Sequence, residues 1–413
     1  MDFELSSHLE KLAKIFGKKT DLYIVGGFVR DKILGLKTQD IDLCSSLTIT
    51  QVQTLLKDTN YILKEPNKKT GTVKICCEHE VWDYSTFRKE NYLNNGSHTP
   101  YEVEFVKTPS EDSKRRDFTV NSIYYNINKK EILDFYNGIN DIKKRVIRCI
   151  ETPYYVLKND GVRILRMIRQ ATQLNFTISK DTLHYAKKMC DNLKEISNHR
   201  KFDELIKILD LDNRYIIFYK SFVKGLKLFN KLGLWKFYFE NVAKIKYKMV
   251  KKADRENRFT GLLIDLVNTT KPDCISYYLQ NCLMQKGIGL SKNKITKDIE
   301  VVCGYFDAKN LLNNKEYFFT YFDSFPRISK LLEKSSLLVF NKYNFFYNYI
   351  VKYKVPVRIK DLKINGSDIK QNYPKISEKR YKYILTDLLN KVFRAEIDNN
   401  KQCLIDEVKT YDN

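Results

Sequence analysis

Two aspartates separated by one residue are the first side chains whose spacing indicates chemistry. Asp40 and Asp42 lie in the segment DIDLC (40–44), which alternates like a half-buried strand. Residues i and i+2 of a strand point to the same face, so the two carboxylates would lie side by side and repel one another. A divalent cation such as Mg²⁺ offsets this repulsion and keeps coordination positions open for substrate phosphates. Taken alone, the pattern fits a solvated strand edge equally well.

Two further features make a metal site more specific. Gly26 and Gly27 end the apolar segment LYIVGG just before a helical stretch, where backbone N–H groups can approach a triphosphate closely. Asp83 lies in the later strand-like segment EVWDYSTFR (80–88), and a third carboxylate can orient or deprotonate a hydroxyl nucleophile. Alone, these residues fit a tight turn and a surface aspartate. Together with the first two acids they indicate a nucleotidyl-transfer centre.

The string RRDFTVNS (115–122) adds candidate ligands for phosphate and sugar. Arginine presents forked donors to phosphate oxygens, and Arg116 and Asp117 are predicted to hold each other in orientation. Asn121 offers both a donor and an acceptor to a sugar hydroxyl. A basic helix entry beside a strand would explain the arginines, but not the whole string.

The elements that must position these residues fall into two parts. Strand and helix signals alternate over roughly the first 150 residues, and the polar segment 89–103 reads as a mobile loop. The expected strands cover 22–27, 40–44, 71–77, 80–88, VNSIYYNI and KEILDFY, and the expected helices cover 1–17, 29–35 and 51–58. From about Tyr154 the apolar period becomes helical, with one basic break at 353–368. The sequence therefore predicts an α/β head followed by a long all-α extension.

Composition limits the partners and the compartment. The formal net charge of +23 over 413 residues favours a polyanionic partner, although a lysine-rich codon bias competes with that interpretation. The nine cysteines are scattered without a CxxC pair, and the five histidines form no HExxH pattern, which disfavours disulfide frameworks and zinc chemistry. With no signal-peptide pattern and no stretch of membrane-spanning length, we expect a cytoplasmic protein without a membrane partner.

The motifs occur in the order found in class II CCA-adding enzymes and the related poly(A) polymerases. The resemblance covers almost the whole chain, strongly over 20–210 and patchily over 215–345, and is closest to the bacterial CCA-adding enzymes. Ordered motifs at matching spacing are far more specific than any one of them. Besides RRDFTVNS, they are GGFVRD (26–31), DID (40–42), TFR (86–88), DFYNG (134–138), NDGVRILRMIRQATQLNF (159–176), ISNHRKFDELIKIL (196–209) and PVRIKDLKINGSDI (356–369).

The resemblance implies an α+β fold class: a polymerase-β-type nucleotidyltransferase head with a mixed sheet, followed by an elongated all-α neck, body and tail. It places the head over 1–150, a neck with nucleotide-selecting residues over 151–213, a body over 214–345 and a tRNA-binding tail over 346–413. It further implies that Asp40 and Asp42 bind two Mg²⁺ ions and that Asp83 is the third catalytic acid. The implied nucleotide-binding residues are Gly26, Gly27, Arg30, Arg116, Asp117, Asn121, Asp160, Arg163, Arg166 and Arg169, and the hinge residues are Asp134 and Gly138.

Asp160 and Arg163 match the pair that selects the nucleotide in the family. CTP and ATP both present an exocyclic amine beside a ring-nitrogen acceptor, which suits an aspartate acceptor and an arginine donor. UTP and GTP present the reverse pattern, and each buried polar group left unpaired costs about 1–3 kcal/mol. At i and i+3 the two residues are expected to share a helix face, and a surface ion pair is the alternative explanation.

Two residues depart from the family pattern. Asn159 precedes the selecting aspartate and His199 precedes Arg200, where the family usually has glutamate, whereas Glu204 is kept. The loss of two acids predicts looser holding of the selecting pair and a less strict choice of nucleotide.

The expected function is therefore addition of C, C and A to the 3′ end of tRNA, from CTP and ATP and without a nucleic-acid template. KTGTVKI (69–75), the segment 89–103 and the tail favour full CCA addition over poly(A), CC-only or A-only addition. A catalytically silent tRNA-binding protein is the alternative from another class. We expect tRNA to be bound through its 3′ end and acceptor and T arms, without an obligate protein partner. The residues expected to grip it are Lys352, Lys354, Arg358, Lys360 and Lys363.

Overall fold

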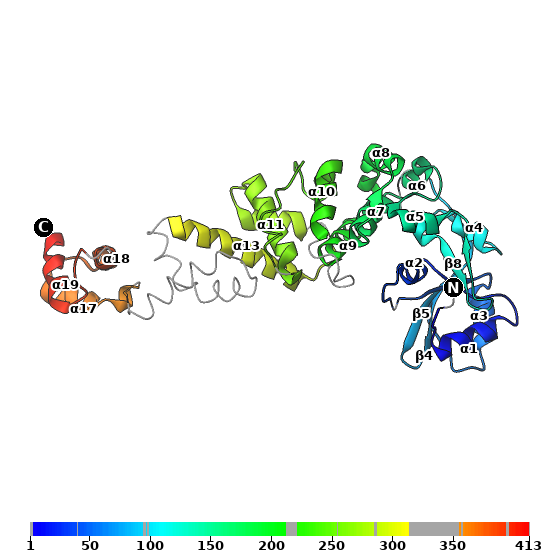
Figure 1. The fold of residues 1–413 in the computed structure, drawn as a ribbon. Coiled ribbons are helices and arrows are strands. Elements are labelled where there is room, and N and C mark those ends of the chain that lie inside the picture. Colours follow the sequence, from blue (N-terminus) through cyan, green and yellow to red (C-terminus); the bar gives the residue numbers. More distant parts are fainter. Residues whose placement is uncertain are drawn as a thin grey trace. The chain divides into compact units, whose positions relative to one another are not determined.

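The computed structural model describes residues 3–38, 40–93, 96, 99–211, 221–253, 255–284, 287–313, 355–356, 358–393 and 396–412 (Figure 1). The chain forms two compact units, one of residues 1–247 with 281–291 and the other of residues 248–280 with 292–413. The head and neck predicted from the sequence both lie in the first unit. The finer division into neck, body and tail stays a prediction.

A seven-stranded sheet forms the centre of the head. A mixed sheet was predicted, but its strand over 62–67 was not. Its strand order is β3-β4-β5-β2-β1-β8-β9, in which β2 and β5 run parallel and all other neighbours are antiparallel. The strands are β1 (Tyr23–Val25), β2 (Asp42–Ser45), β3 (Ile62–Asn67), β4 (Thr72–Cys77), β5 (Glu80–Thr86), β8 (Ile123–Asn126) and β9 (Glu131–Asp134). The expected strand over 40–44 begins two residues late, because Asp40 precedes β2.

Helices cover one face of this sheet. Phe16 of α1 packs against Tyr84 of β5 with ring centroids 5.7 Å apart, and α3 lies against β3. Ser6 caps the first turn of α1, and Thr48 and Gln51 form a capping box on α3, so both helix starts are encoded locally. The helices of the head are α1 (Ser7–Phe16), α2 (Gly27–Ile33), α3 (Ile49–Leu56), α4 (Pro109–Ser113), η1 (Thr119–Asn121) and α5 (Gly138–Lys144).

The opposite face of the sheet carries the acids. Strand register places Val25, Asp42, Asp83, Lys74 and Lys64 in one continuous row across β1, β2, β5, β4 and β3. Side chains alternate along a strand, so this row points away from the face that α1 covers. One face of the sheet therefore packs against the helices. The other combines this charged row with a buried hydrophobic cluster of Tyr23, Val25, Cys44, Phe87, Val106 and Tyr124.

The polar segment 89–103, predicted to be a loop, contains paired strands. β6 (Arg88–Asn91) and β7 (Glu102–Phe105) form an antiparallel ribbon at its two ends. The prediction was wrong for these ends because β6 (RKEN) is polar throughout, and the alternation of β7 (EVEF) covers only four residues at the end of the segment and beyond it. Of the residues between the strands, the structure describes 92–93, 96 and 99–101.

Helices follow the head, as the change of period predicted. α6 (Pro153–Asn159) and α7 (Val162–Gln173) are separated by Asp160 and Gly161. The remaining elements of the first unit are β10 (Val146–Ile147), which pairs with β11 (Thr177–Ile178), and α8 (Lys180–Lys188), η2 (Cys190–Glu195), α9 (Asn198–Leu209), α10 (Phe222–Leu232) and η4 (Leu234–Phe237). α7 and α9 pack against each other and supply the helical residues of the site described below.

The second unit is helical over its described residues. It contains η5 (Arg255–Asn257), α11 (Arg258–Thr270), α13 (Lys292–Asn313), η7 (Ile359–Asp361), α17 (Gly366–Asn372), α18 (Glu378–Phe393), α19 (Lys401–Val408) and η8 (Lys409–Tyr411), while α12 (Ile275–Leu283) crosses the sequence boundary between the units. Ile369, Ile384, Leu388 and Leu404 belong to a core shared by α17, α18 and α19.

The basic residues predicted to grip RNA fall partly within the second unit's described residues. Lys360 and Lys363 are exposed, and the Arg358 guanidinium lies 3.3 Å from the Asp361 carboxylate. Lys352 and Lys354 lie outside the described residues.

Candidate active site

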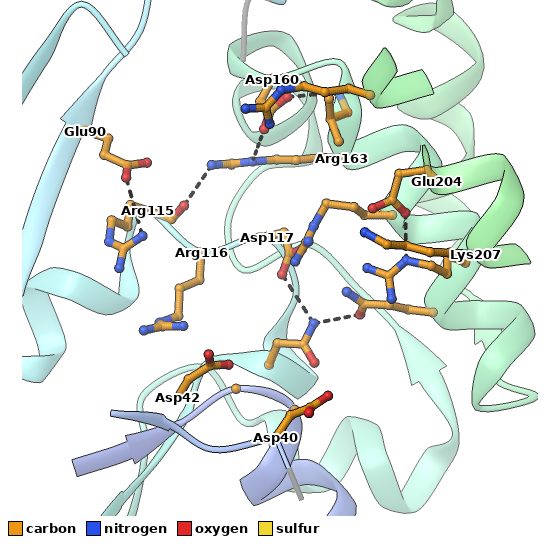
Figure 2. Close-up of a pocket in the computed structure, with 18 of the residues that line it drawn as sticks. Asp40, Asp42, Glu90, Arg115, Arg116, Asp117, Asp160, Arg163, Glu204 and Lys207 are labelled. Atoms are coloured by element: carbon orange, nitrogen blue, oxygen red, sulfur yellow. Dashed lines mark hydrogen bonds and ion pairs between the residues drawn. The ribbon is translucent and has the colours of Figure 1, made fainter. Parts of the chain in front are cut away.

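A cleft of about 750 Å³ opens on the charged face of the sheet. Its lining comes from the head, the whole length of α7 and one side of α9, all within the first unit. Figure 2 shows Asp40 and Asp42 facing Asp160 and Arg163 across this space. The residues predicted from separate motifs are thus brought to one site, with the exception of Asp83, Asp134 and Gly138, which are not part of its lining.

The acids lie close enough to influence one another. Asp42 begins β2, and its register partner on β5 is Asp83. Partial burial raises the pKa of the Asp42 carboxyl, Asp83 and Asp40 raise it further through repulsion, and Arg116 opposes the shift. Asp83 lines a second cleft that shares Asp42 with the first. Asp83 and Asp40 therefore both lie near enough to the Asp42 carboxylate to repel it.

Gly26 and Gly27 lie beside this group at the start of α2. Gly26 has φ +84°, a conformation that favours glycine, and a Cβ there would lie 3.6 Å from Asp42 Oδ2. A side chain at this position would be strained by the backbone conformation, although its Cβ would meet the acid only at ordinary contact distance. The main chain passes next to the acidic group, in the position predicted for triphosphate contact.

Arg116 has a different partner from the one predicted. Asp112 is fully buried and accepts hydrogen bonds from Arg115 Nε (2.8 Å), Arg116 Nη2 (3.0 Å) and the Tyr124 hydroxyl (2.7 Å). Burial alone would raise the pKa of this carboxyl, but the two guanidinium groups hold it well below its usual range. The expected pairing of Arg116 with Asp117 was wrong because α4 brings a better-placed carboxylate beneath both arginines.

Asp117 instead joins the head to α7. Its Oδ2 accepts a hydrogen bond of 2.8 Å from Arg166 Nε, and Asn121 Nδ2 donates to Gln170 Oε1 at 2.7 Å. Arg30 Nη1 donates to Asn121 Oδ1 at 2.7 Å and forms an ion pair with Asp31. Arg30, Asn121 and Asp117 thus line the cleft while they hold its walls together.

The buried Asp117 carboxylate should make the stability of the fold depend on pH. Burial would raise its pKa, but Arg166 and Arg163 lower it from 3.8 to about 2. The depressed pKa stabilises the fold by about 2 kcal/mol above pH 4, and this contribution is lost as pH falls toward 2. Urea unfolding between pH 2.5 and 7 should therefore show the advantage of the wild type over Asp117→Asn shrinking below pH 4. An advantage that does not vary with pH would contradict the assignment.

The selecting pair is buried but does not share a helix face as predicted. Asp160 has extended backbone between α6 and α7, and its Oδ1 accepts from the Val162 N–H at 2.9 Å. Arg163 in α7 donates to the carbonyls of Arg115 (2.8 Å) and Val156 (3.3 Å), and its Nε lies 3.8 Å from Asp160 Oδ2. The sequence did not reveal the break between α6 and α7, because the helical spacing of the apolar residues continues across Asp160 and Gly161.

The two departures from the family pattern lie away from the cleft. Neither Asn159 nor His199 belongs to its lining. Asn159 ends α6, and the His199 ring packs so closely on Gly289 that a Cβ there would lie 2.5 Å from His199 Cδ2. Glu204, the retained acid, accepts from Arg169 Nε at 2.7 Å. The contacts of Asp160 and Arg163 described above involve neither departing residue.

Main-chain contacts tie the segment after β6 to the break before α7. The Gly161 N–H donates to the Gly96 carbonyl at 3.0 Å. Asn192 lies against both glycines, because a Cβ at Gly96 would lie 2.6 Å from Asn192 Cβ and one at Gly161 would lie 2.8 Å from the Asn192 carbonyl oxygen. We refer to Gly96, Gly161 and Asn192 as the glycine tether.

The predicted hinge residues are close-packed. Asp134 accepts from the N–H groups of Gly138 and Ile139, each at 2.8 Å, which fixes the start of α5. A Cβ on Gly138 would lie 2.2 Å from the Thr119 carbonyl oxygen. A role as a hinge stays a prediction.

Several residues of the site were not predicted. Glu90 forms ion pairs with Arg88 and Arg115, and the Tyr92 hydroxyl donates to it at 2.7 Å. Asp112 and Gln170 also belong to the network described above. Glu90, Asp112 and Gln170 lie on the polar ribbon, α4 and α7, where a single polar residue adds nothing to the periodic pattern of the sequence. Spacing from the arginine motif, at i−3 and i−4, is the one sequence feature that pointed to Asp112.

Comparison with known proteins tests the resemblance. The family described as "Poly A polymerase head domain" matches residues 22–148, and the one described as "Probable RNA and SrmB- binding site of polymerase A" matches residues 175–246. The CCA-adding enzyme of Staphylococcus aureus is 31% identical over 299 residues, 72% of this chain and 68% of that protein. This chain belongs to the CCA-adding enzyme family.

Other members of the CCA-adding enzyme family match over greater length. The enzyme of Ligilactobacillus salivarius is 27% identical over 98% of this chain and 96% of its own. The crystal structure of the Bacillus stearothermophilus CCA-adding enzyme in complex with CTP covers 98% of this chain and 97% of its own, with 20% identity and a TM-score of 0.58. The predicted polymerase-type head followed by helices is thereby confirmed as the fold of a CCA-adding enzyme. Over the described residues, no helix is long and apolar enough to cross a membrane.

Proposed function

We propose that this chain adds C, C and A to the 3′ end of tRNA, taking CTP and ATP as substrates and no nucleic-acid template. The observation that carries the proposal is the cleft in which Asp40 and Asp42 face Asp160 and Arg163. The acids suit nucleotidyl transfer, and the buried pair suits a base that offers an amine beside a ring acceptor. A binding protein without catalysis has no use for repelling acids in a phosphate cleft.

The family relatives support the choice of substrates. Similarly folded CCA-adding enzymes have been solved with CTP, with ATP and, from Thermotoga maritima, with tRNA. The net charge of +23 is consistent with an RNA partner. Exposed Lys360 and Lys363 in the tail are proposed to contact the tRNA backbone. We also place the protein in the cytoplasm, where its nine free cysteines would stay reduced.

The donor set fits two magnesium ions. Asp40 and Asp42 provide hard carboxylate oxygens, which Mg²⁺ prefers, and a cation would offset both the burial and the repulsion that raise the pKa of Asp42. Mg²⁺ bound there would neutralise the triphosphate charge and lower the pKa of the attacking 3′-hydroxyl.

The remaining roles follow from the contacts of the chain's own residues. Asp83, next to Asp42 in the row, is placed to orient the 3′-hydroxyl and accept its proton. Arg116, fixed by Asp112, presents its guanidinium to the phosphates, and Asp117, Arg166 and Asn121 frame the sugar. Gly26 and Gly27 offer main-chain N–H groups to the triphosphate.

Nucleotide choice is proposed to depend on Asp160 and Arg163. Asp160 would accept from the amine of C or A, and Arg163 would donate to the ring nitrogen. Because Asn159 and His199 do not line the cleft, we expect their effect on selection to be small and indirect. U and G should therefore be incorporated at least tenfold more slowly than C and A, on the basis of about 1–3 kcal/mol for each unpaired buried group.

A time course with tRNA lacking its 3′ CCA tests the proposal. With CTP alone we expect two added residues, with both CTP and ATP three, and with ATP alone none. UTP and GTP supply the selection control. Long adenylate tails would indicate a poly(A) polymerase, and stopping at C-C with both nucleotides present would indicate a CC-adding enzyme. No addition under any condition would leave the RNA-binding alternative.

A further inference from the structure

A second cleft, of about 370 Å³, lies on the other side of the acids. It shares Asp42, Arg88, Arg115 and Arg116 with the first cleft, and it extends over β5 and β4 instead of toward α7 and α9. Lys74 and Asp83 project into it from neighbouring positions in the row of charged residues. It is therefore a continuation of the site along the open face of the sheet.

The strand order gives the two clefts different roles. β1, with Gly26 and Gly27 at its end, flanks β2 on one side, and β5 with Asp83 flanks it on the other. In nucleotidyl transfer, the attacking oxygen and the leaving pyrophosphate lie in line on opposite sides of the phosphorus. If the glycines hold the triphosphate, the 3′-hydroxyl must approach from the β5 side, and the strand that carries it must lie over β5 and β4.

Lys74 is the cation placed on that path. Its Nζ lies 2.6 Å from Glu65 Oε2, and both side chains are exposed, by 42% and 70%. Glu65 reaches it because a register shift between Lys64 and Asn67 and a positive φ of 52° turn its side chain across the strand pair. An exposed pair of this kind is weak, so an RNA phosphate can displace Glu65 from Lys74.

We propose that the second cleft binds the unpaired 3′-terminal nucleotide of the RNA substrate, with Lys74 contacting its backbone phosphate and Glu65 holding Lys74 until RNA arrives. This inference rests on the proposed function for the identity of the reaction. It adds where the 3′ end of the RNA lies, and it assigns a role in RNA binding to the Lys74–Glu65 ion pair on the outer strands β3 and β4. Lys74 is in this view a positioning residue, because it would touch the phosphate next to the reacting nucleotide.

Two variants and two RNAs test the proposal. The RNAs are a minihelix with one unpaired 3′ nucleotide and the same minihelix with a blunt end. Lys74→Gln should weaken equilibrium binding of the first RNA about fivefold, leave the second unchanged, and reduce the salt slope for the first by about 0.7. Glu65→Gln should tighten binding of the first RNA, because it frees Lys74 from its ion pair. In steady state, the KM for RNA should change and the KM for CTP should not.

The matched control is Lys129→Gln, which removes another exposed lysine of the head that pairs with an aspartate, Asp21, at 2.9 Å. This variant should bind both RNAs like the wild type. Equal effects of Lys74→Gln and Lys129→Gln would overturn the inference. Weakening by Glu65→Gln would also overturn it, since the pair would then merely hold β3 to β4. The affinity measurements need no turnover, so a wild type without nucleotide addition would overturn the proposed function separately.

Discussion

Asp42→Ala should reduce nucleotide addition by about 10³-fold or more while changing RNA affinity less than threefold. The carboxylate lies at the start of β2, between the glycines of α2 and Asp83, so its loss removes a proposed metal ligand without disturbing the basic surface. Because burial and, to a smaller extent, repulsion from Asp83 and Asp40 raise its pKa, ionised Asp42 costs stability at neutral pH. The free energy of unfolding should therefore stay the same or increase. Single-turnover addition of C, RNA binding and urea unfolding measure the three quantities.

The control for this variant is Asp58→Ala, an exposed aspartate that follows α3. It should match the wild type in all three measurements. Full activity of Asp42→Ala would eliminate the two-metal assignment. A loss of activity accompanied by a loss of stability would instead identify Asp42 as a structural residue.

Asp112→Asn is expected to have the largest effect on stability, a loss of about 3 kcal/mol. The substitution keeps the shape of the side chain but leaves the Arg115 and Arg116 guanidinium groups without the buried charge that they share. Both arginines line the nucleotide cleft, so the KM for CTP should also rise at least tenfold. Urea unfolding at pH 7 and steady-state kinetics at saturating RNA test the two effects.

The comparison variant is Asp203→Asn on α9, which loses an exposed ion pair with Lys207 of 2.7 Å. An exposed pair contributes about 0–1 kcal/mol, so its stability should be close to that of the wild type. If Asp112→Asn were no less stable than Asp203→Asn, the buried carboxylate would not be the anchor of the two arginines.

The sequence predicted most of the head because its strands follow one simple rule. Ile24 and Leu43 belong to short runs that are either apolar throughout or alternate, and such runs bounded by turn residues can be read directly. The ribbon of β6 and β7 obeys no such rule, since neither of its faces is a continuous core. The break at Asp160 was missed for a related reason. Its carboxylate bonds the Val162 N–H, a local contact that ends one helix and begins the next within the apolar period.

For the site, motif order identified the groups but not their partners. Asp40, Asp42, Asp160 and Arg163 all line the predicted cleft. The partner of Arg116 could not be predicted, because an arginine with an adjacent aspartate reads as an obvious pair until α4 supplies Asp112. Similarly, the link from Asn121 to Gln170 spans 49 residues and depends on how α7 packs against the head. Long-range choices among several acceptable partners are decided by packing, which the sequence does not display.

The glycine tether has a consequence for how this protein can vary between species. The hydrogen bond from Gly161 to Gly96 joins two main-chain atoms, and Asn192 closes on both glycines where any Cβ would collide. This hydrogen bond therefore uses no side chain of the segment between β6 and β7. Substitutions elsewhere in that segment can accumulate without breaking it, whereas even alanine at either glycine would. A fixed glycine at each end of this hydrogen bond is the evolutionary trace that such a main-chain attachment should leave.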